Sequence, residues 1–262
     1  KQYRLTRDPR LTLFTFRRCL AHFAVDDDNV YMTTKLDGKK TNFIPLNKGY
    51  DRGAGNPPNP HGFSTDYLWK EIWEKKSLLN IIQHFVHDEK VLDDKGRQTG
   101  RKLIFPRYHQ LDCVRRLIDD SRQKGPGQKY LVQHSAGSGK SNSIAWLAHQ
   151  LSVLHDDDDT PVFDSAIIIT DRKILDKQLQ RTVSEFQQTR GVVENIEKTS
   201  KQLKEALEVG KRIIITTLQK FPVILGEVGN LAGNKFAVII DEAHSSQTGE
   251  SSRKMRHILQ TS

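Results

Sequence analysis

The segment His-Ser-Ala-Gly-Ser-Gly-Lys-Ser, which begins at His134, has the residue types needed to bind a polyphosphate. Gly137 and Gly139 allow the backbone to approach phosphate oxygens closely, because they carry no Cβ. Lys140 would reach the β- and γ-phosphates, and the hydroxyl of Ser141 is a ligand for Mg²⁺. The generic phosphate-binding loop begins with Gly where this chain has His134, and a flexible Gly/Ser turn is the alternative interpretation.

The sequence on either side predicts a strand before this loop and a helix after it. Residues 129–132 form a short apolar run that is typical of a buried strand. After the loop, apolar residues recur at helical spacing, at Ile144, Leu147, Ala148, Leu151 and Leu154. The amide groups and the positive dipole end at a helix N-terminus form an anion site. We therefore expect a nucleoside triphosphate to bind at this loop.

A second motif supplies carboxylates for the same chemistry. Residues 236–240 form an apolar run typical of a strand buried on both faces of a parallel sheet, and Asp241 and Glu242 follow it directly. At the carboxyl end of such a strand Asp241 can hold Mg²⁺, and Glu242 can orient and deprotonate an attacking water. Carboxylates that only cap a helix are the alternative for one isolated motif. Both motifs together favour a site that hydrolyses the triphosphate.

Composition limits the remaining possibilities. The chain has 262 residues, enough for one or two domains. Its formal net charge of +9 favours a polyanionic partner, with nucleic acid as the first candidate. Cys19 and Cys113 are too few for a disulfide framework or a zinc site, so we expect a cytoplasmic protein. No apolar run approaches the ~18 residues of a membrane span, and we expect no membrane partner.

Periodicity divides the chain into three parts. In residues 104–262, apolar strand-like runs at 164–170, 212–216 and 236–240 alternate with amphipathic helical segments. This alternation predicts an α/β domain with a doubly wound parallel sheet, whose ligands bind at the carboxyl ends of the strands.

Residues 1–87 follow another pattern. They contain strand-like runs at 11–16, 21–25 and 30–34, an irregular Gly/Pro loop, and helical spacing over 66–86. Residues 88–103 are charged and contain glycines, and they are interpreted as a linker.

Several motifs in this chain resemble one family, the motor (restriction) subunit of type I restriction–modification enzymes, which are superfamily-two DEAH-box DNA translocases. Its phosphate loop begins with His, as at His134, and its DEAH box resembles residues 241–244 together with the Ser-Ser-Gln-Thr-Gly that follows. Ile-Thr-Asp-Arg at 169–172 and Ile-Thr-Thr-Leu-Gln-Lys-Phe at 215–221 resemble two further helicase motifs, and Pro-Arg-Tyr-His-Gln at 106–110 resembles a segment that recognises adenine.

The resemblance implies a fold, cofactors and roles for individual residues. It implies a RecA-like ATPase lobe over residues 104–262, preceded over residues 1–87 by the C-terminal part of an α+β nuclease-type domain. The cofactors are ATP and Mg²⁺. Glu242, Asp241 and Lys140 are the implied catalytic residues, and Ser141 and Asp241 are the implied metal ligands. ATP contacts fall on Gln110, Ser135, Ala136, Gly137, Ser138, Gly139, Lys140 and Ser141, and DNA contacts on Arg172, Thr217, Gln219 and Lys220.

The implied activity is ATP-driven translocation of double-stranded DNA with cleavage, in a complex with methylation and specificity subunits. The family's nuclease has a cluster of an Asp and a Glu-x-Lys, and the first hundred residues contain no such cluster. The family's second motor lobe, which carries the arginine finger, is also not found in this sequence. Since an arginine finger contributes ~10³-fold or more in rate, we expect this chain alone to bind ATP, hydrolyse it poorly and cut nothing. The alternatives are another DEAH-box helicase, for example one that acts on RNA, and a non-catalytic DNA- or partner-binding module.

Overall fold

The computed structural model describes residues 6–93, 95–135, 137–170, 177–186, 191–197, 199–220 and 233–242. The chain divides into two compact units, Lys1–Asp112 and Cys113–Ser262. The division falls within helix α3 (Tyr108–Lys124). Among the expected site residues, Ala136, Arg172 and the residues after Glu242 lie outside the described part of the chain.

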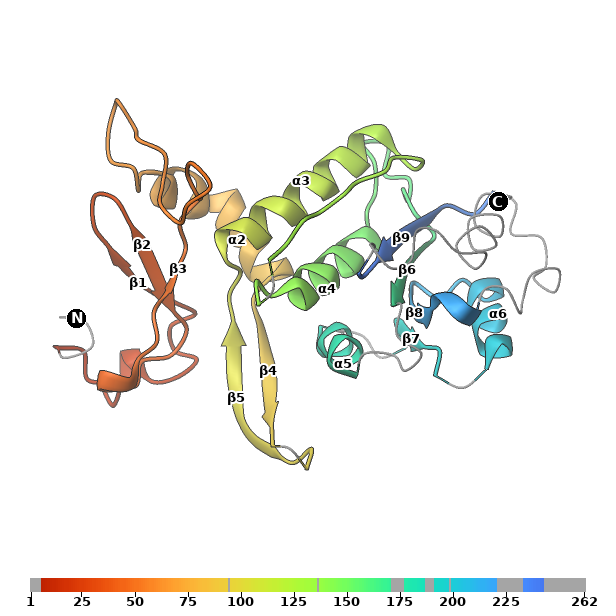
Figure 1. The fold of residues 1–262 in the computed structure, drawn as a ribbon, viewed down its shortest axis with the longest axis horizontal. Coiled ribbons are helices and arrows are strands. Elements are labelled where there is room, and N and C mark those ends of the chain that lie inside the picture. The colour runs from red at the N-terminus through yellow and green to blue at the C-terminus, as the bar shows by residue number, and fades with distance from the viewer. Residues whose placement is uncertain are drawn as a thin grey trace. The chain divides into compact units, whose positions relative to one another are not determined.

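The first unit contains a three-stranded antiparallel sheet in the order β1-β2-β3 (Figure 1). β1 (His22–Val25) and β2 (Val30–Thr33) form the hairpin that the sequence predicts, and β3 (Ile44–Pro45) pairs with the other edge of β2. Asp26 closes the turn of the hairpin, because its carboxylate accepts from the backbone N–H groups of Asp28 and Asn29 at 3.0 and 2.7 Å.

The predicted strand over residues 11–16 is wrong. This segment forms the 3₁₀ turn η1 (Thr12–Phe14), in which the N–H of Phe14 donates to the carbonyl of Leu11 at 2.8 Å. Leu11 and Leu13 are both exposed. The alternating apolar side chains therefore face solvent and provide no buried face that would hold the segment in a sheet.

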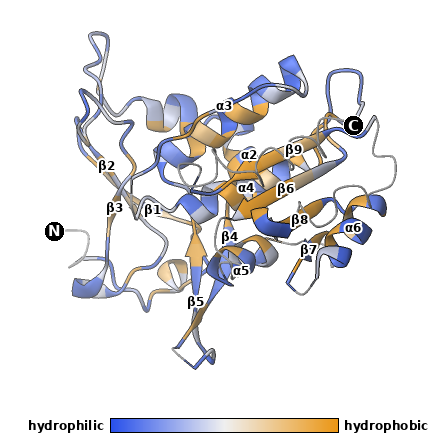
Figure 2. Ribbon diagram, turned by 45° about the vertical axis from the view of Figure 1, so that its right-hand side comes forward, coloured by the Kyte–Doolittle hydropathy of each residue, from blue (hydrophilic) through white to orange (hydrophobic). Residues whose placement is uncertain are grey.

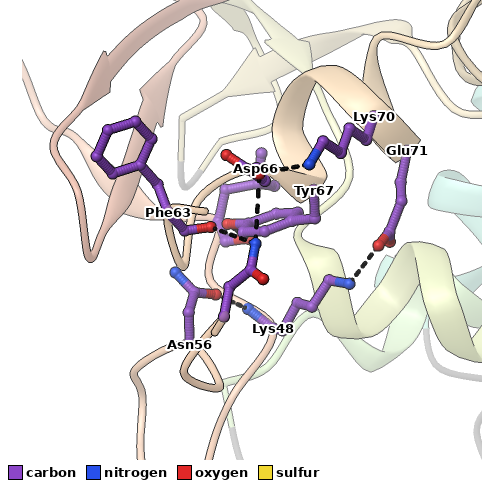
Figure 3. A network of polar contacts seen from close by, with 9 residues as sticks. Lys48, Asn56, Phe63, Asp66, Tyr67, Lys70 and Glu71 are labelled. Carbon is purple, nitrogen blue, oxygen red and sulfur yellow. Dashed lines mark hydrogen bonds and ion pairs between the residues drawn. The ribbon is translucent and has the colours of Figure 1, made fainter. Parts of the chain in front are cut away.

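The helical spacing over residues 66–86 corresponds to two elements, the π-helix η3 (Leu68–Ile72) and the α-helix α2 (Lys75–His84). A polar network anchors η3 (Figure 3). The ammonium of Lys48 donates to Glu71 at 2.6 Å and lies 5.1 Å from the centre of the Tyr67 ring, while the Tyr67 hydroxyl donates to the carbonyl of Leu46. Burial raises the pKa of Tyr67 to about 12, so this hydroxyl remains a hydrogen-bond donor at neutral pH.

Residues 88–103 are not the linker that their composition suggests. They form most of an antiparallel hairpin, β4 (His87–Leu92) with β5 (Gln98–Ile104), which Figure 1 shows as a long two-stranded ribbon. Asp93 and Gly96 make the turn, where the side chain of Asp93 accepts from the N–H groups of Lys95 and Arg97 at 3.0 and 2.8 Å. The glycines thus serve a tight turn and a strand rather than a flexible connection.

The second unit is built on a parallel sheet in the order β7-β8-β6-β9 among the described residues. Figure 2 shows its inner strands as the most hydrophobic part of this unit. Every residue of β6 (Ser165–Thr170) and β8 (Ile213–Thr217) is buried, and β9 (Phe236–Ile240) pairs with β6. The three strands predicted from their isoleucine-rich runs are therefore confirmed, whereas β7 (Val193–Asn195) was not predicted.

Three helices of this unit follow the predicted periodicity. They are α4 (Lys140–Leu151), α5 (Lys177–Glu185) and α6 (Ser200–Glu208). Each buries apolar residues at helical spacing, among them Ile144, Ala148 and Leu151 on α4, Leu179 and Val183 on α5, and Leu203, Ala206 and Leu207 on α6.

The predicted strand over residues 129–132 is wrong. The segment has no strand pairing in the structure, and Leu131 is 84% exposed. The Tyr130 hydroxyl donates to the carboxylate of Asp120 at 2.6 Å, which ties the segment to α3. An apolar run this short leaves strand and loop equally possible, and here a side-chain contact rather than a sheet edge fixes it.

The burial of β6 predicts a large difference between two alanine substitutions in the same sheet. Ile167→Ala, at a fully buried position, should destabilise the second unit by about 2–5 kcal/mol, because it leaves a cavity in the core. Val238→Ala on β9, which is 37% exposed, should cost about 1 kcal/mol or less. Amide hydrogen exchange of β8 measures both effects. Equal protection in the two variants would contradict the assignment of β6 to the core.

Candidate nucleotide-binding site

The loop before α4 turns through two glycines in the left-handed region. Gly137 has φ 73°, and Gly139, the N-cap of α4, has φ 83°. A Cβ placed on Gly137 would meet no atom within 4 Å, so the loop is open at this point. The N–H of Ser138 donates to the carbonyl of Ser135 at 3.2 Å, which closes the turn. These conformations bring the loop to the N-terminus of a 12-residue helix, where unpaired N–H groups favour an anion.

The carboxylates of the second motif follow β9 directly. The N–H of Asp241 donates to the carbonyl of Ile169 at 2.9 Å, and this bond continues the pairing of β9 with β6 by one residue. Glu242 has φ 53°, a left-handed conformation that is uncommon for a residue with a side chain. Such backbone strain persists where the surroundings impose it and is concentrated at functional sites.

Lys140 joins the two motifs. Its ammonium donates to Oε1 of Glu242 at 2.5 Å and lies 3.5 Å from Oδ1 of Asp241. The first residue of α4 and the residues after β9 therefore meet, although they are 102 positions apart in the sequence. One ammonium faces two carboxylates, so the three side chains together carry an excess of negative charge.

This arrangement raises the pKa of Lys140. The hydrogen bond from the ammonium to Glu242 is the largest cause, and the negative charge of Asp241 adds to it. The charged form of Lys140 is therefore favoured, and the ion pair persists up to alkaline pH before the ammonium loses its proton. Because the Lys140 side chain is 39% exposed, solvent screens the pair, and its value lies in positioning more than in stability.

The residues present fit a magnesium nucleotide. Among the described residues, no group of three or more His, Cys, Asp or Glu side chains could hold a metal ion. Mg²⁺ does not require such a cage, since it is usually bound by one or two carboxylates, water and the phosphates of the nucleotide. Asp241 offers a carboxylate beside the loop, and Ser141 is the second residue of α4, next to Lys140.

Gln110 has a structural role at the start of α3. Its side-chain carbonyl accepts from the N–H of Arg107 at 2.9 Å, and its own N–H donates to the carbonyl of Arg107. The first contact is half of a capping box, in which the third helical residue reaches back to the N–H of the N-cap, and the second is a backbone bond of the first turn. Gln110 is buried and belongs to the first compact unit. Its recognition of adenine stays a prediction.

The expected DNA contacts differ in their exposure. Thr217, the last residue of β8, is buried, and the ammonium of Lys220 donates to the carbonyl of Ile196. Desolvation lowers the pKa of Lys220, as expected of an ammonium directed toward the protein. Gln219 is exposed. The DNA contacts of these residues stay predictions.

Sequence reasoning did not select Thr170 as a site residue. It is the last residue of β6, beside Ile169, whose carbonyl accepts from Asp241. The Thr170 hydroxyl is buried and has no hydrogen-bond partner among the described residues. A polar group in that state is costly, and at the carboxyl edge of the sheet it is a candidate to contact a ligand. Two signals in the sequence could have found it: its place in the Ile-Thr-Asp-Arg motif at 169–172 and its position at the end of a predicted strand.

Comparison with known proteins identifies the family of this α/β unit. The sequence model of the SWI2/SNF2 ATPase matches residues 109–262, more than half of the chain. The chain belongs to the SWI2/SNF2 ATPase family. Such an ATPase domain implies use of ATP with a divalent metal ion.

The chain is also similar to curated endonuclease subunits of type I restriction enzymes. It is 31% identical to that of Staphylococcus aureus strain COL, 29% to that of S. aureus strain MW2 and 28% to that of Staphylococcus saprophyticus. Each match covers 163 residues, which are 61% of this chain and 16% of the relative. The aligned part is thus about a sixth of each relative. In the described part of the chain, no helix is long and apolar enough to cross a membrane.

The ion pair predicts that the pKa of Lys140 depends on the carboxylate of Glu242. Glu242→Gln should lower the pKa of Lys140, because the hydrogen bond to Glu242 is the main cause that raises it. An NMR titration of ¹³C-methylated lysines measures the pKa directly. Glu205→Gln is the matched control, since it removes the carboxylate 3.9 Å from the exposed Lys201. An unchanged Lys140 titration in the Glu242 variant would contradict the contact.

Proposed function

We propose that this chain holds the ATP-binding lobe of a DNA-translocating endonuclease subunit of a type I restriction complex. One observation carries the proposal: the contact of Lys140 with Glu242 and Asp241. This contact brings the glycine loop and the acidic motif after β9 to one site. Membership in the SWI2/SNF2 ATPase family and the similarity to type I restriction endonuclease subunits support it. Methylation and specificity subunits and double-stranded DNA are the proposed partners.

The proposed chemistry follows from the groups at the site. The loop around Gly137 and Gly139 binds the phosphates through backbone N–H groups, and Lys140 binds them through its ammonium. Ser141 and Asp241 would hold a Mg²⁺, and that ion would neutralise charge on the phosphates. Glu242 accepts a proton from the water that attacks the terminal phosphate.

The observed ion pair adds a requirement to this sequence of events. While Lys140 donates to Glu242, Oε1 of that carboxylate is engaged with the ammonium rather than with a water. A triphosphate carries more negative charge than one carboxylate, so it competes for the ammonium. Movement of Lys140 onto phosphate frees Glu242 to act as the base. Binding of the nucleotide therefore activates the residue that hydrolyses it.

Substitutions at the two ends of the ion pair separate binding from hydrolysis. Lys140→Ala should abolish ATP binding, since it removes the cation for the phosphates. Glu242→Gln should leave binding intact and lower the hydrolysis rate by about 10²- to 10⁴-fold, because it removes the base. Lys201→Ala on α6, whose side chain is 81% exposed, is the control. Calorimetry measures ATP binding and phosphate release measures hydrolysis, each with the complete protein that contains this chain.

The same assay distinguishes the proposed function from the alternatives. Duplex DNA should stimulate the ATPase, whereas stronger stimulation by RNA would favour another DEAH-box helicase. A Lys140→Ala protein that restricts DNA like the wild type would instead favour a non-catalytic binding module. Methylation and specificity subunits should co-purify with the complete protein.

Gln110 provides a separate test of nucleotide selectivity. Gln110→Glu keeps a side-chain oxygen that can cap α3 but removes the amide donor that would read adenine. If that donor contacts the base, affinity for ATP should fall by about tenfold, while affinity for inorganic tripolyphosphate stays unchanged. Gln110→Ala, which also loses the cap, controls for helix stability. Wild-type ATP affinity in the Glu variant would refute adenine recognition by this side chain.

A further inference from the structure

One face of the β4–β5 ribbon gathers basic side chains around a single carboxylate. In the register of this hairpin Lys90 is paired directly with Arg101, so these two cations lie on the same face. Asp88, two residues before Lys90, also lies on this face and accepts from Arg101 at 2.9 Å. Arg17, from outside the hairpin, forms an ion pair with the same carboxylate. We call Arg17, Lys90 and Arg101 the cationic face.

The charges of this face do not balance. Asp88 is shared by two guanidinium groups, and Lys90 adds a third cation with no carboxylate of its own among the described residues. The opposite face is balanced, because Lys102 pairs with Glu89 at 3.7 Å. At the turn, Arg97 pairs with Asp93 at 3.0 Å. The excess of positive charge is therefore specific to one face of the ribbon.

On the cationic face, the cations are more exposed than the carboxylate that lies between them. The side chains of Arg17 and Arg101 are 48% and 41% exposed, whereas the carboxylate residue between them, Asp88, is 21% exposed. Lys90 is exposed as well. An approaching molecule would meet the cations first.

Two features of this face are unfavourable for stability alone. Like charges directly opposite each other on a strand pair repel, as Lys90 and Arg101 do. Arg17 has φ 75°, a left-handed conformation that suits glycine. Strained residues of this kind persist where the surrounding structure holds them, and they are concentrated at binding sites. An anion that bridges the cations would relieve the repulsion.

We propose that the cationic face binds the sugar–phosphate backbone of duplex DNA. A two-stranded antiparallel ribbon is narrow enough to enter or follow the major groove. Lys and Arg side chains on it would contact phosphates and so position the protein without reading sequence. The inference rests on the proposed function, because it takes duplex DNA as the polymer that the protein moves.

The test compares two faces of the same ribbon. Lys90→Gln leaves the Asp88–Arg101 ion pair in place, and the double variant K90Q/R101Q removes a second cation. Lys102→Gln is the matched control, since it makes the same charge change on the opposite face. Binding of the purified protein to a short random-sequence duplex is measured without nucleotide at about 50 to about 200 mM salt.

The slope of log K against log salt is negative, and we expect each lost phosphate contact to make it shallower by about 0.9. Each lost contact should also weaken binding about fivefold near 0.15 M salt. Lys90→Arg should restore both quantities, and K102Q should match the wild type. Equal behaviour of K90Q, K90Q/R101Q and K102Q would overturn the proposal, as would a wild-type protein that does not bind duplex DNA. Competition by polyglutamate as effective as that by DNA would assign the face to an acidic protein segment instead.

This measurement is independent of the ATP site. Lys140→Ala should retain the salt dependence conferred by the cationic face, because Lys140 lies outside the hairpin. If the wild type lacks a DNA-stimulated ATPase but K90Q still weakens duplex binding, the proposed motor function fails and the DNA-binding face remains. If the ATPase behaves as proposed and the hairpin variants bind normally, only the present inference fails.

Discussion

The contact between Lys140 and Glu242 is the interaction on which the functional interpretation depends. It requires that the end of β9 and the start of α4 lie together, and the packing of the second unit achieves this. β9 pairs with the fully buried strand β6, and the backbone bond from Asp241 to Ile169 extends that pairing to the acidic motif. Gly139 begins α4 in a left-handed conformation, so that Lys140 is the first helical residue. A hydrophobic sheet thus determines where an ion pair can form.

The parts of this unit that the sequence predicts are those with strong periodicity. The isoleucines of β6 and β8 are buried on both faces of the sheet, so an unbroken apolar run is enough to identify the strands. The failures occur where this signal is weak. Residues 129–132 are too short a run to distinguish a strand from a loop, and their position depends on a hydrogen bond from Tyr130 to Asp120 that no local pattern contains. β7 has three residues and depends on its pairing with β8.

The β4–β5 hairpin shows a different reason for failure. Only the end of this ribbon at Leu103 and Ile104 is buried, and the rest is partly or fully exposed on both faces. It therefore has no sustained apolar alternation, and its strands resemble a charged linker in sequence. Its register becomes visible only when cross-strand pairs are known. In the site, likewise, the sequence identifies Lys140, Asp241 and Glu242 as candidates, but not that the ammonium is held by Glu242. The capping role of Gln110 is also a matter of local geometry that a motif does not specify.

Charge balance connects the two functional regions. Most ion pairs described in this protein are matched one to one, as in Lys102 with Glu89 or Lys70 with Asp66. At the proposed nucleotide site two carboxylates share one ammonium, whereas on the hairpin two guanidinium groups share one carboxylate beside a further lysine. The first imbalance suits a divalent cation and the second suits phosphate, since each ligand supplies the missing sign. A protein selected only for stability would tend to neutralise both. Their opposite signs therefore argue for two different ligands, a metal-bound nucleotide at the sheet and a polyanion at the ribbon.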